Sequence, residues 1–271
     1  MSSYELLDSG NGRKLEKIGP VTVIRQAAQA FWPMSLPRWP AVDAEHIRSN
    51  KGGGHWQFRH KVSDRWTVSF GGMSFVVKLT SFGHIGIFPE QQENWSWIRA
   101  QSTPEKSILN LFGYTGGSTL AAAQVGASVT HVDASKGVVH WARDNQQANG
   151  LDQANIRWLV DDVSKFMARE QRRNSAYDGI ILDPPTYGRG SKGETFRIED
   201  DLIPLLEALR AVVKPSHFGL LSCHTPGFTP LVLSQIVARV FGKVTLEAGE
   251  MVVPYGSSVL PSGTFVRWLI Q

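Results

Sequence analysis

The sequence predicts an α/β protein in which a seven-stranded sheet flanked by helices follows a small β-rich N-terminal domain. Two observations support this prediction. From residue 107 onward, short apolar runs alternate with helix-length segments, a pattern typical of βαβ units. Before residue 100, β-branched and aromatic runs are separated by glycine turns and show no helical period over most of their length. We therefore expect domains at residues 1–100 and 101–271.

The best-defined unit lies between Ser107 and Asp133. Residues 108–112 have the length of a buried strand, and the Gly-Tyr-Thr-Gly-Gly turn at 113–117 ends it. A helix to residue 125 and a second strand ending at Asp133 complete the unit. Glycines let a ligand lie against the backbone, and the carboxylate can accept both hydroxyls of a ribose. The alternative is an ordinary βαβ turn in an unrelated α/β protein.

The glycine spacing limits the class of cofactor. Dinucleotide folds normally carry G-x-G-x-x-G beneath a pyrophosphate, and this loop departs from that spacing. A nucleoside without a pyrophosphate, such as S-adenosylmethionine, fits the loop better.

Composition excludes several other classes of protein. The 271 residues contain no apolar run of about 18 and no N-terminal signal pattern, so we expect a cytoplasmic protein without a membrane segment. A single cysteine, Cys223, excludes an internal disulfide and a cysteine-built zinc site. The eight histidines form no H-E-x-x-H motif, so no metal is indicated.

Charge and tryptophan are concentrated in the first part of the chain. Residues 1–100 carry 12 Lys and Arg against 8 Asp and Glu, whereas residues 101–271 carry 16 of each, and six of the nine tryptophans lie in the first part. Cations among exposed rings can bind RNA. Equally, the rings can form the core of a small domain whose charges face solvent.

The N-terminal part is expected to form a small sheet. Its strand candidates are residues 21–24, 56–58, 66–70 and 75–79, and the proline-rich and tryptophan-rich residues 31–40 suit an extended connector. Pro89 and Glu90 open a helix through Ile98. We expect this helix to form a wall of the cofactor pocket, or else a simple linker between domains.

After Asp133, helices and strands alternate to the end of the chain. The expected helices are 137–149, 163–173, 201–213 and 231–241, and the expected strands are 156–160, 177–182, 218–222, 244–246 and an antiparallel 264–270. Asp161 and Asp162 follow the third strand of this sheet, and we choose Asp162 to accept from an adenine amino group.

An Asp-Pro-Pro turn follows the fourth strand. Pro184 and Pro185 fix the backbone beside Asp183. Ligands of open α/β sheets bind outside the carboxyl ends of the strands, so this turn and the glycine loop are expected to share one crevice. The alternative is an incidental turn.

Together these motifs resemble class I S-adenosylmethionine-dependent methyltransferases, which have a Rossmann-like seven-stranded sheet. More narrowly, residues 112–117, Asp161-Asp162-Val163 and Leu182-Asp-Pro-Pro-Thr-Tyr187 resemble the 23S rRNA cytosine-C5 methyltransferases that carry an N-terminal PUA domain. The resemblance covers about residues 80–271. The chain departs from that group because no room remains for a PUA domain and because His224-Thr225-Pro226 follows Cys223 instead of a serine-glycine pattern.

The resemblance implies an rRNA substrate, S-adenosylmethionine as cofactor, and a set of site residues. The cofactor-binding residues would be Phe88, Gln91, Asn110, Phe112, Tyr114, Thr115, Gly116, Asp133, Asp162 and Pro184. Asp183 would hold the target base, and Cys223 would be the nucleophile. A thiolate adds at carbon 6 of the pyrimidine and makes carbon 5 nucleophilic enough to accept a methyl group.

Three alternatives remain open. Cys223 can be an inert small hydrophobe, in which case the enzyme methylates a nitrogen of guanine or a small molecule and the Asp-Pro-Pro turn accepts from an amino group. The chain can also be a catalytically silent RNA-binding factor that keeps the fold. An oxidoreductase binding a dinucleotide is the weakest alternative because of the glycine spacing.

Overall fold

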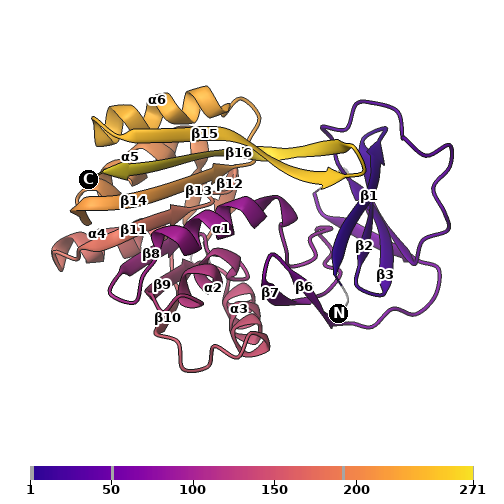
Figure 1. Ribbon diagram of the computed structural model, residues 1–271, viewed down its shortest axis with the longest axis horizontal. Coiled ribbons are helices and arrows are strands. Elements are labelled where there is room, and N and C mark those ends of the chain that lie inside the picture. The colour runs from indigo at the N-terminus through magenta and orange to yellow at the C-terminus, as the bar shows by residue number, and fades with distance from the viewer. Residues whose placement is uncertain (1–2, 50–51, 191–192, 271) are drawn as a thin grey trace. The chain divides into compact units, whose positions relative to one another are not determined.

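The computed structural model describes residues 3–49, 52–190 and 193–270, and the chain divides into two compact units (Figure 1). Unit 1 comprises Met1–Gln92 and Val252–Ser262, and unit 2 comprises Glu93–Met251 and Gly263–Gln271. The domain boundary at residues 100 and 101 stays a prediction.

Unit 1 contains a five-stranded sheet in the order β1-β2-β3-β4-β5 and a separate hairpin, β6-β7. The strands are β1 (Tyr4–Gly10), β2 (Arg13–Ile18), β3 (Val21–Gln26), β4 (Ala44–Arg48), β5 (Gly54–Phe58), β6 (Trp66–Phe70) and β7 (Met73–Val77). Runs of β-branched and aromatic residues made β3, β5, β6 and β7 visible in the sequence. The strands β1, β2 and β4 were missed because they alternate charged and apolar residues.

The connection between the parallel strands β3 and β4 contains the expected extended segment at residues 31–40. Asp8 of β1 holds this segment in place. Its carboxylate accepts hydrogen bonds from the backbone amide of Leu36 at 3.0 Å and from the indole nitrogen of Trp39 at 2.7 Å. These bonds lower the pKa of Asp8 despite the opposing effect of burial.

Unit 2 contains most of the seven-stranded sheet, whose order is β10-β9-β8-β11-β14-β16-β15. The strands are β8 (Ser107–Leu111), β9 (Ser128–Asp133), β10 (Ile156–Val160), β11 (Tyr177–Leu182), β14 (Val213–Cys223), β15 (Thr245–Tyr255) and β16 (Ser258–Ile270). The five strands from β10 to β14 are parallel, and β16 runs antiparallel to β14. The predicted fold class, a seven-stranded sheet with a β-rich N-terminal part, is confirmed.

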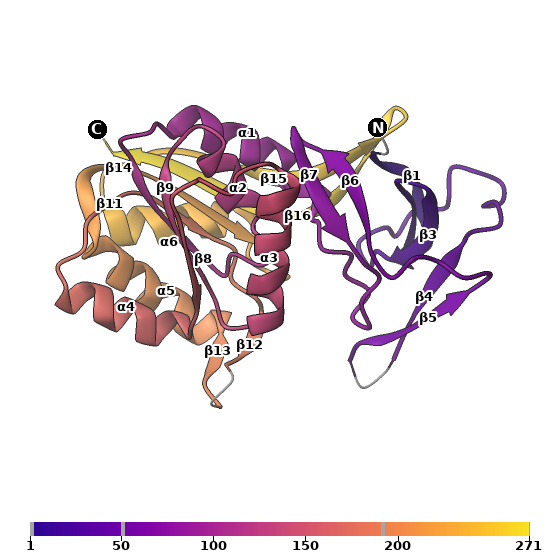
Figure 2. The same ribbon diagram turned by 90° about the horizontal axis from the view of Figure 1, so that it is seen from below.

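Six α-helices cover the sheet of unit 2. They are α1 (Gln92–Gln101), α2 (Gly117–Ala123), α3 (Lys136–Ala148), α4 (Val163–Arg172), α5 (Ile198–Arg210) and α6 (Pro230–Phe241). The helices α1, α2 and α3 lie on one face and α4, α5 and α6 on the other (Figure 2). A short 3-10 helix, η1 (Pro89–Gln91), precedes α1.

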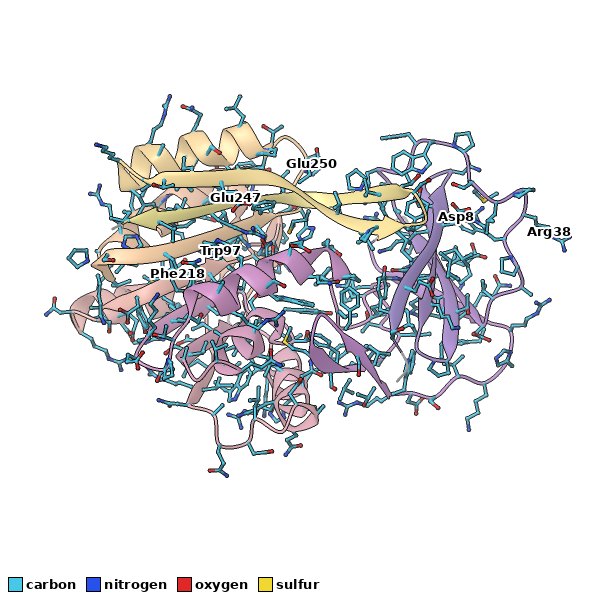
Figure 3. All side chains as sticks on the ribbon, viewed as in Figure 1. Asp8, Arg38, Trp97, Phe218, Glu247 and Glu250 are labelled. Atoms are coloured by element: carbon cyan, nitrogen blue, oxygen red, sulfur yellow. The ribbon has the colours of Figure 1, made fainter. Side chains whose placement is uncertain are left out.

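Glycines in the central strands make room for large rings. A Cβ on Gly219 would lie 2.0 Å from the ring of Trp268, and a Cβ on Gly179 would lie 2.2 Å from Phe218. Phe218 also meets Trp97 of α1 edge to face, with ring centroids 5.6 Å apart (Figure 3). Close packing of this kind holds the helices at fixed positions over the sheet.

Several elements of the seven-stranded sheet and its helices differ from the sequence expectation, and β14, β15 and β16 are longer than the strands expected at 218–222, 244–246 and 264–270. The helix expected at 201–213 begins three residues earlier, because Glu199, Asp200 and Asp201 form an acidic first turn that suits the positive end of a helix. The segment after the Asp-Pro-Pro turn, for which no strand was expected, contains a short antiparallel pair, β12 (Tyr187–Arg189) and β13 (Thr195–Arg197).

Candidate functional site

The parallel strands of unit 2 all end at one edge of the sheet. Leu111, the last residue of β8, pairs with Val132 of β9 on one side and with Leu182 of β11 on the other. The chain runs from β8 outward to β10 and then returns to β11 on the opposite side of β8. The edge beyond Leu111 is therefore a topological switch point, where open α/β sheets bind ligands.

The glycine loop after β8 has an unusual backbone. Phe112 and Tyr114 have positive φ angles of 55° and 49°, and Gly116, at 89°, caps α2. Left-handed conformations of non-glycine residues cost energy and cluster at functional sites. A Cβ on Gly113 would lie 2.4 Å from the ring of His131, and a Cβ on Gly117 would lie 2.8 Å from Trp95. These glycines therefore allow the loop to pack closely on its neighbours.

Asp133 ties the end of β9 to this loop. One carboxylate oxygen accepts the backbone amide of Tyr114 at 3.1 Å, and the other accepts the amide of Ser135 at 2.8 Å. Burial raises the pKa of Asp133, while the two amide bonds oppose the shift. A carboxylate oxygen can accept more than one hydrogen bond, so Asp133 keeps capacity for two hydroxyl donors.

Three buried polar side chains next to the glycine loop are linked by hydrogen bonds. The side-chain amide of Asn110 donates to the hydroxyl of Thr119 at 2.9 Å, and that hydroxyl lies 2.9 Å from Nδ1 of His131. Burial lowers the pKa of His131 to about 3, so the imidazole is neutral near pH 7. Sequence reasoning missed Thr119 and His131, although polar residues within apolar segments were a usable signal.

The remaining predicted cofactor residues of unit 2 lie around the same edge. The carbonyl of Thr115 accepts from Asn145 at 2.9 Å, and the ring of Tyr114 lies 6.3 Å from that of Trp141. Phe112 packs on Phe196, with centroids 5.0 Å apart.

The two aspartates after β10 differ in their partners. Asp161 is paired with Arg169, whereas Asp162 caps α4 by accepting the amide of Lys165 at 3.0 Å. This difference agrees with the choice of Asp162 over Asp161 as the adenine partner, which stays a prediction.

Phe88 and Gln91 belong to unit 1, where Gln91 is buried in η1 and Phe88 precedes it. Their contribution to a cofactor pocket stays a prediction.

Asp183 and His224 follow the neighbouring strands β11 and β14. Nε2 of His224 lies 3.6 Å from Oδ1 of Asp183, and both side chains are partly exposed. The hydroxyls of Thr186 and Thr225, 2.7 Å apart, join the two turns. Pro184 is buried next to Asp183. An acceptor carboxylate and an imidazole thus stand together at the edge that carries the glycine loop.

Cys223 is also at this edge, at the end of β14, but its thiol is buried. The side chain is 1% exposed and belongs to the apolar core of unit 2. Burial raises the pKa of the thiol, and the nearby charge of Asp183 adds to that effect, although the amide of Thr225 donates to the sulfur at 3.4 Å. Reactive cysteines have lowered pKa values and electropositive surroundings, so this environment is typical of a structural cysteine.

Among the described residues the chain has neither a metal-binding cluster nor a helix that could cross a membrane. Within residues 3–49, 52–190 and 193–270, no cluster of three or more His, Cys, Asp or Glu side chains could hold a metal ion. Across the same ranges, no helix has the length and apolar character needed to cross a membrane.

Comparison with known proteins identifies relatives of both units. The family model described as S-adenosylmethionine-dependent methyltransferase matches residues 23–248. The ribosomal RNA large subunit methyltransferase K/L of Syntrophotalea carbinolica is 32% identical over 194 residues, which are 71% of this chain and 27% of that protein. The chain thus spans about a quarter of the length of this curated relative.

Two solved structures have the same fold as this chain over all or nearly all of its residues. The S-adenosylmethionine-dependent methyltransferase of Agrobacterium tumefaciens is 36% identical, with a TM-score of 0.93 and coverage of 100% of this chain and 91% of that chain. The protein SMU.776, solved in complex with SAH, has a TM-score of 0.78 at 22% identity and covers 98% of this chain and 75% of its own. At that identity, the second likeness shows the fold alone.

Proposed function

Because the chain belongs to the S-adenosylmethionine-dependent methyltransferase family, we propose that it transfers a methyl group from this cofactor to a nucleobase of ribosomal RNA. The observation that carries the choice of acceptor is the similarity to ribosomal RNA large subunit methyltransferase K/L over 71% of the chain. An acceptor in ribosomal RNA also agrees with the predicted cytoplasmic location.

The residues at the sheet edge fit the cofactor. The glycine loop, with its positive φ angles at Phe112 and Tyr114, lies beside the switch point, and Asp133 retains acceptor capacity for a ribose. Asp162 offers a carboxylate after the neighbouring strand for an adenine amino group. When bound, the cofactor supplies an electrophilic methyl group on a positively charged sulfur. These assignments extend to Asn110, Phe112, Tyr114, Thr115, Gly116, Pro184, Phe88 and Gln91 as proposed pocket residues.

We favour a nitrogen of a purine, such as guanine, as the methyl acceptor. Nitrogen methylation needs an acceptor for the N–H bond and a path for one proton, and it needs no covalent nucleophile. Asp183 and His224, 3.6 Å apart at neighbouring strand ends, supply both. The burial of Cys223 and its raised pKa weigh against a mechanism that starts with a thiolate.

In this mechanism Asp183 accepts a hydrogen bond from the N–H group of the base, which orients the nitrogen lone pair toward the incoming methyl group. The methylated nitrogen must lose one proton as the sulfur–carbon bond of the cofactor breaks; Asp183 would take up this proton and His224 would carry it to solvent. The rigid Asp-Pro-Pro turn holds the carboxylate in one geometry, which favours a single orientation of the base.

Carbon 5 of cytosine is the second candidate acceptor. One observation favours it: Cys223 is the last residue of β14 and Asp183 follows the neighbouring parallel strand β11, so both lie at the same sheet edge, as the cysteine mechanism requires. This mechanism needs the thiol to become accessible and ionised when RNA binds.

Identification of the labelled nucleoside decides between the candidates. The protein is incubated with methyl-labelled S-adenosylmethionine and with bulk RNA from a strain that lacks the protein. The RNA is then digested to nucleosides. We expect the label in a methylated guanosine or adenosine. Label in 5-methylcytidine would move the proposal to the cysteine mechanism, and the absence of label from RNA would overturn RNA as the acceptor.

A silent RNA-binding factor is tested separately by calorimetry. Measurable binding of S-adenosylmethionine supports an enzyme, whereas RNA binding without any cofactor binding would support the silent alternative.

A further inference from the structure

Unit 1 contains a cavity of about 350 Å³ that combines cations with aromatic rings. The side chains that matter for its chemistry are Lys14, Arg25, His46, Arg48, Phe82 and His84. All of them belong to unit 1, whose ranges contain eleven Lys and Arg against seven Asp and Glu, whereas unit 2 contains seventeen of each. The net positive charge of the protein therefore belongs to the unit that contains this cavity.

The floor of the cavity has two cations on neighbouring strands. Lys14 of β2 and Arg25 of β3 are direct cross-strand partners, an arrangement that is destabilising for like charges. Glu16 bridges them: Arg25 donates to both of its oxygens at 2.6 Å, and the ammonium group of Lys14 lies 3.1 Å from one of them. The hydroxyl of Tyr4 donates to the same carboxylate at 2.8 Å, so the carboxylate of Glu16 interacts with three side chains.

The cavity as a whole, floor and rim together, has one more Lys or Arg than carboxylates. Glu90, which is buried, also lines the cavity, so Lys14, Arg25 and Arg48 stand against the two carboxylates of Glu16 and Glu90. Burial and the charge of Arg25 lower the pKa of Lys14, which means that its charged form is poorly compensated. An added anion would improve that compensation.

The rim of the cavity is formed by two adjoining turns. The turn at residues 80–84 is closed by the amide of Gly83, which donates to the carbonyl of Thr80 at 2.9 Å, and Arg25 donates to the carbonyl of Gly83 at 2.9 Å. A Cβ on Gly53, in the turn after β4, would lie 3.7 Å from the ring of Phe82. The hydrogen bond from Arg25 to Gly83 therefore joins the rim to the cationic floor of the cavity.

Phe82 and Arg48 stand on this rim with their functional groups in solvent. The side chain of Phe82 is 70% exposed although its turn is well hydrogen-bonded. Arg48 is exposed, and its guanidinium has no carboxylate partner among the residues that the structure describes. An exposed ring next to uncompensated cations is the combination with which proteins bind single-stranded nucleic acid, by stacking and by phosphate contacts.

We propose that this cavity binds one nucleotide of a single-stranded segment of the RNA substrate, with the phosphate on Lys14 and Arg48 and the base stacked on Phe82. Arg25 and Glu16 hold the floor, and His46 and His84 complete the walls. The inference rests on the proposed function, because it takes RNA as the substrate. It adds a binding site in unit 1, and among the residues that line it Phe88 is also one that the sequence predicts for the cofactor pocket.

The test measures binding of a fluorescein-labelled, single-stranded 12-nucleotide RNA of mixed sequence to the full chain. Phe82→Ala is expected to weaken binding by roughly tenfold, because loss of one base–aromatic stack typically has that effect. Arg48→Gln is expected to weaken binding and to reduce the slope of log K against log salt concentration by about 0.7, the value for one phosphate contact on a single strand.

The double variant Phe31→Ala/Arg38→Gln is the matched control. It removes the same two residue types from exposed positions of the same unit that do not line the cavity, and the side chain of Arg38 points into solvent (Figure 3). This control should bind the RNA like the unaltered protein. Because all four side chains are exposed, unchanged circular dichroism is expected for each variant.

Binding of S-adenosylmethionine and methyl transfer are measured alongside, so that two failures can be told apart. If the unaltered protein binds the RNA and the Phe82 and Arg48 variants bind it equally well, the cavity is not the binding site, while the proposed function stands. If the unaltered protein binds the cofactor but binds no RNA and labels none, the proposed function fails and this inference fails with it.

Discussion

The carboxylate of Asp133 accepts the backbone amide of Tyr114 at 3.1 Å, and this bond joins the end of β9 to the glycine loop that follows β8. The same carboxylate accepts the amide of Ser135. One side chain therefore shapes both loops of the proposed cofactor pocket while offering its remaining lone pairs to a ribose.

Asp133→Ala is expected to lower the affinity for S-adenosylmethionine about tenfold to a hundredfold, because hydrogen bonds to a charged group contribute about 1.5–3 kcal/mol. Calorimetry measures the affinity. The pKa of Asp133 is raised by burial, so the carboxylate protonates at a higher pH than usual, and affinity should weaken as the pH falls toward that raised value. Unchanged affinity in Asp133→Ala would remove this residue from the proposed pocket.

Gly113→Ala is expected to reduce both stability and cofactor affinity. The new methyl group would lie 2.4 Å from the buried ring of His131, and overpacking of this kind costs about 1–3 kcal/mol. Gly137→Ala is the control, since a Cβ there meets nothing within 4 Å and Gly137 lies inside α3. We expect that variant to be as stable as the original or slightly more so. Equal effects of both substitutions on affinity would contradict the argument from close packing.

Glu16→Gln is expected to destabilise the protein by about 3 kcal/mol near pH 7, because it leaves Arg25 and Lys14 buried without their carboxylate. Urea unfolding followed by tryptophan fluorescence measures the change. Glu45→Gln removes the partly exposed partner of Arg13 and should cost under about 1 kcal/mol.

The same carboxylate predicts a pH dependence. The pKa of Glu16 is lowered to about 2, below the value of about 4.3 in unfolded chains. Because the folded-state pKa is the lower one, this stabilisation is fully present above about pH 4.3 and is lost as the pH falls through about 2. The Gln variant should show a smaller loss of stability across that window, and an identical acid profile in both proteins would count against the pairing.

Asp183→Asn is expected to lower kcat about a hundredfold or more and to leave the affinity for S-adenosylmethionine unchanged, since a general base contributes roughly that factor. Cys223→Ala should keep most of the activity and cost about 1 kcal/mol of stability, because it removes a buried sulfur from the core. Loss of activity in Cys223→Ala with normal folding and normal cofactor binding would restore the cysteine mechanism.

The order of elements in unit 2 was readable from the sequence. The parallel strands β10 and β11 are short, mainly apolar runs, and aspartate follows each of them, so their bounds were predicted to the residue. The glycine loop, Asp133 and the Asp-Pro-Pro turn were visible for the same reason. Local chain chemistry specifies these features before any long-range contact forms.

The tertiary structure determined the burial and the charged neighbours of the polar and reactive side chains. Nothing local to Glu16 and Arg25 shows that they are buried together, because their pairing joins β3 to β2, whose alternating charged and apolar residues hid it in the sequence. Nothing local to Cys223 shows that its thiol is in the core, or that His224 meets Asp183 across β11 and β14. Burial and charge proximity set pKa values and reactivity, and both depend on which segments distant in the sequence pack together. The sequence alone therefore determined the fold class and the family motifs, while the environment of each reacting group came from the packed structure.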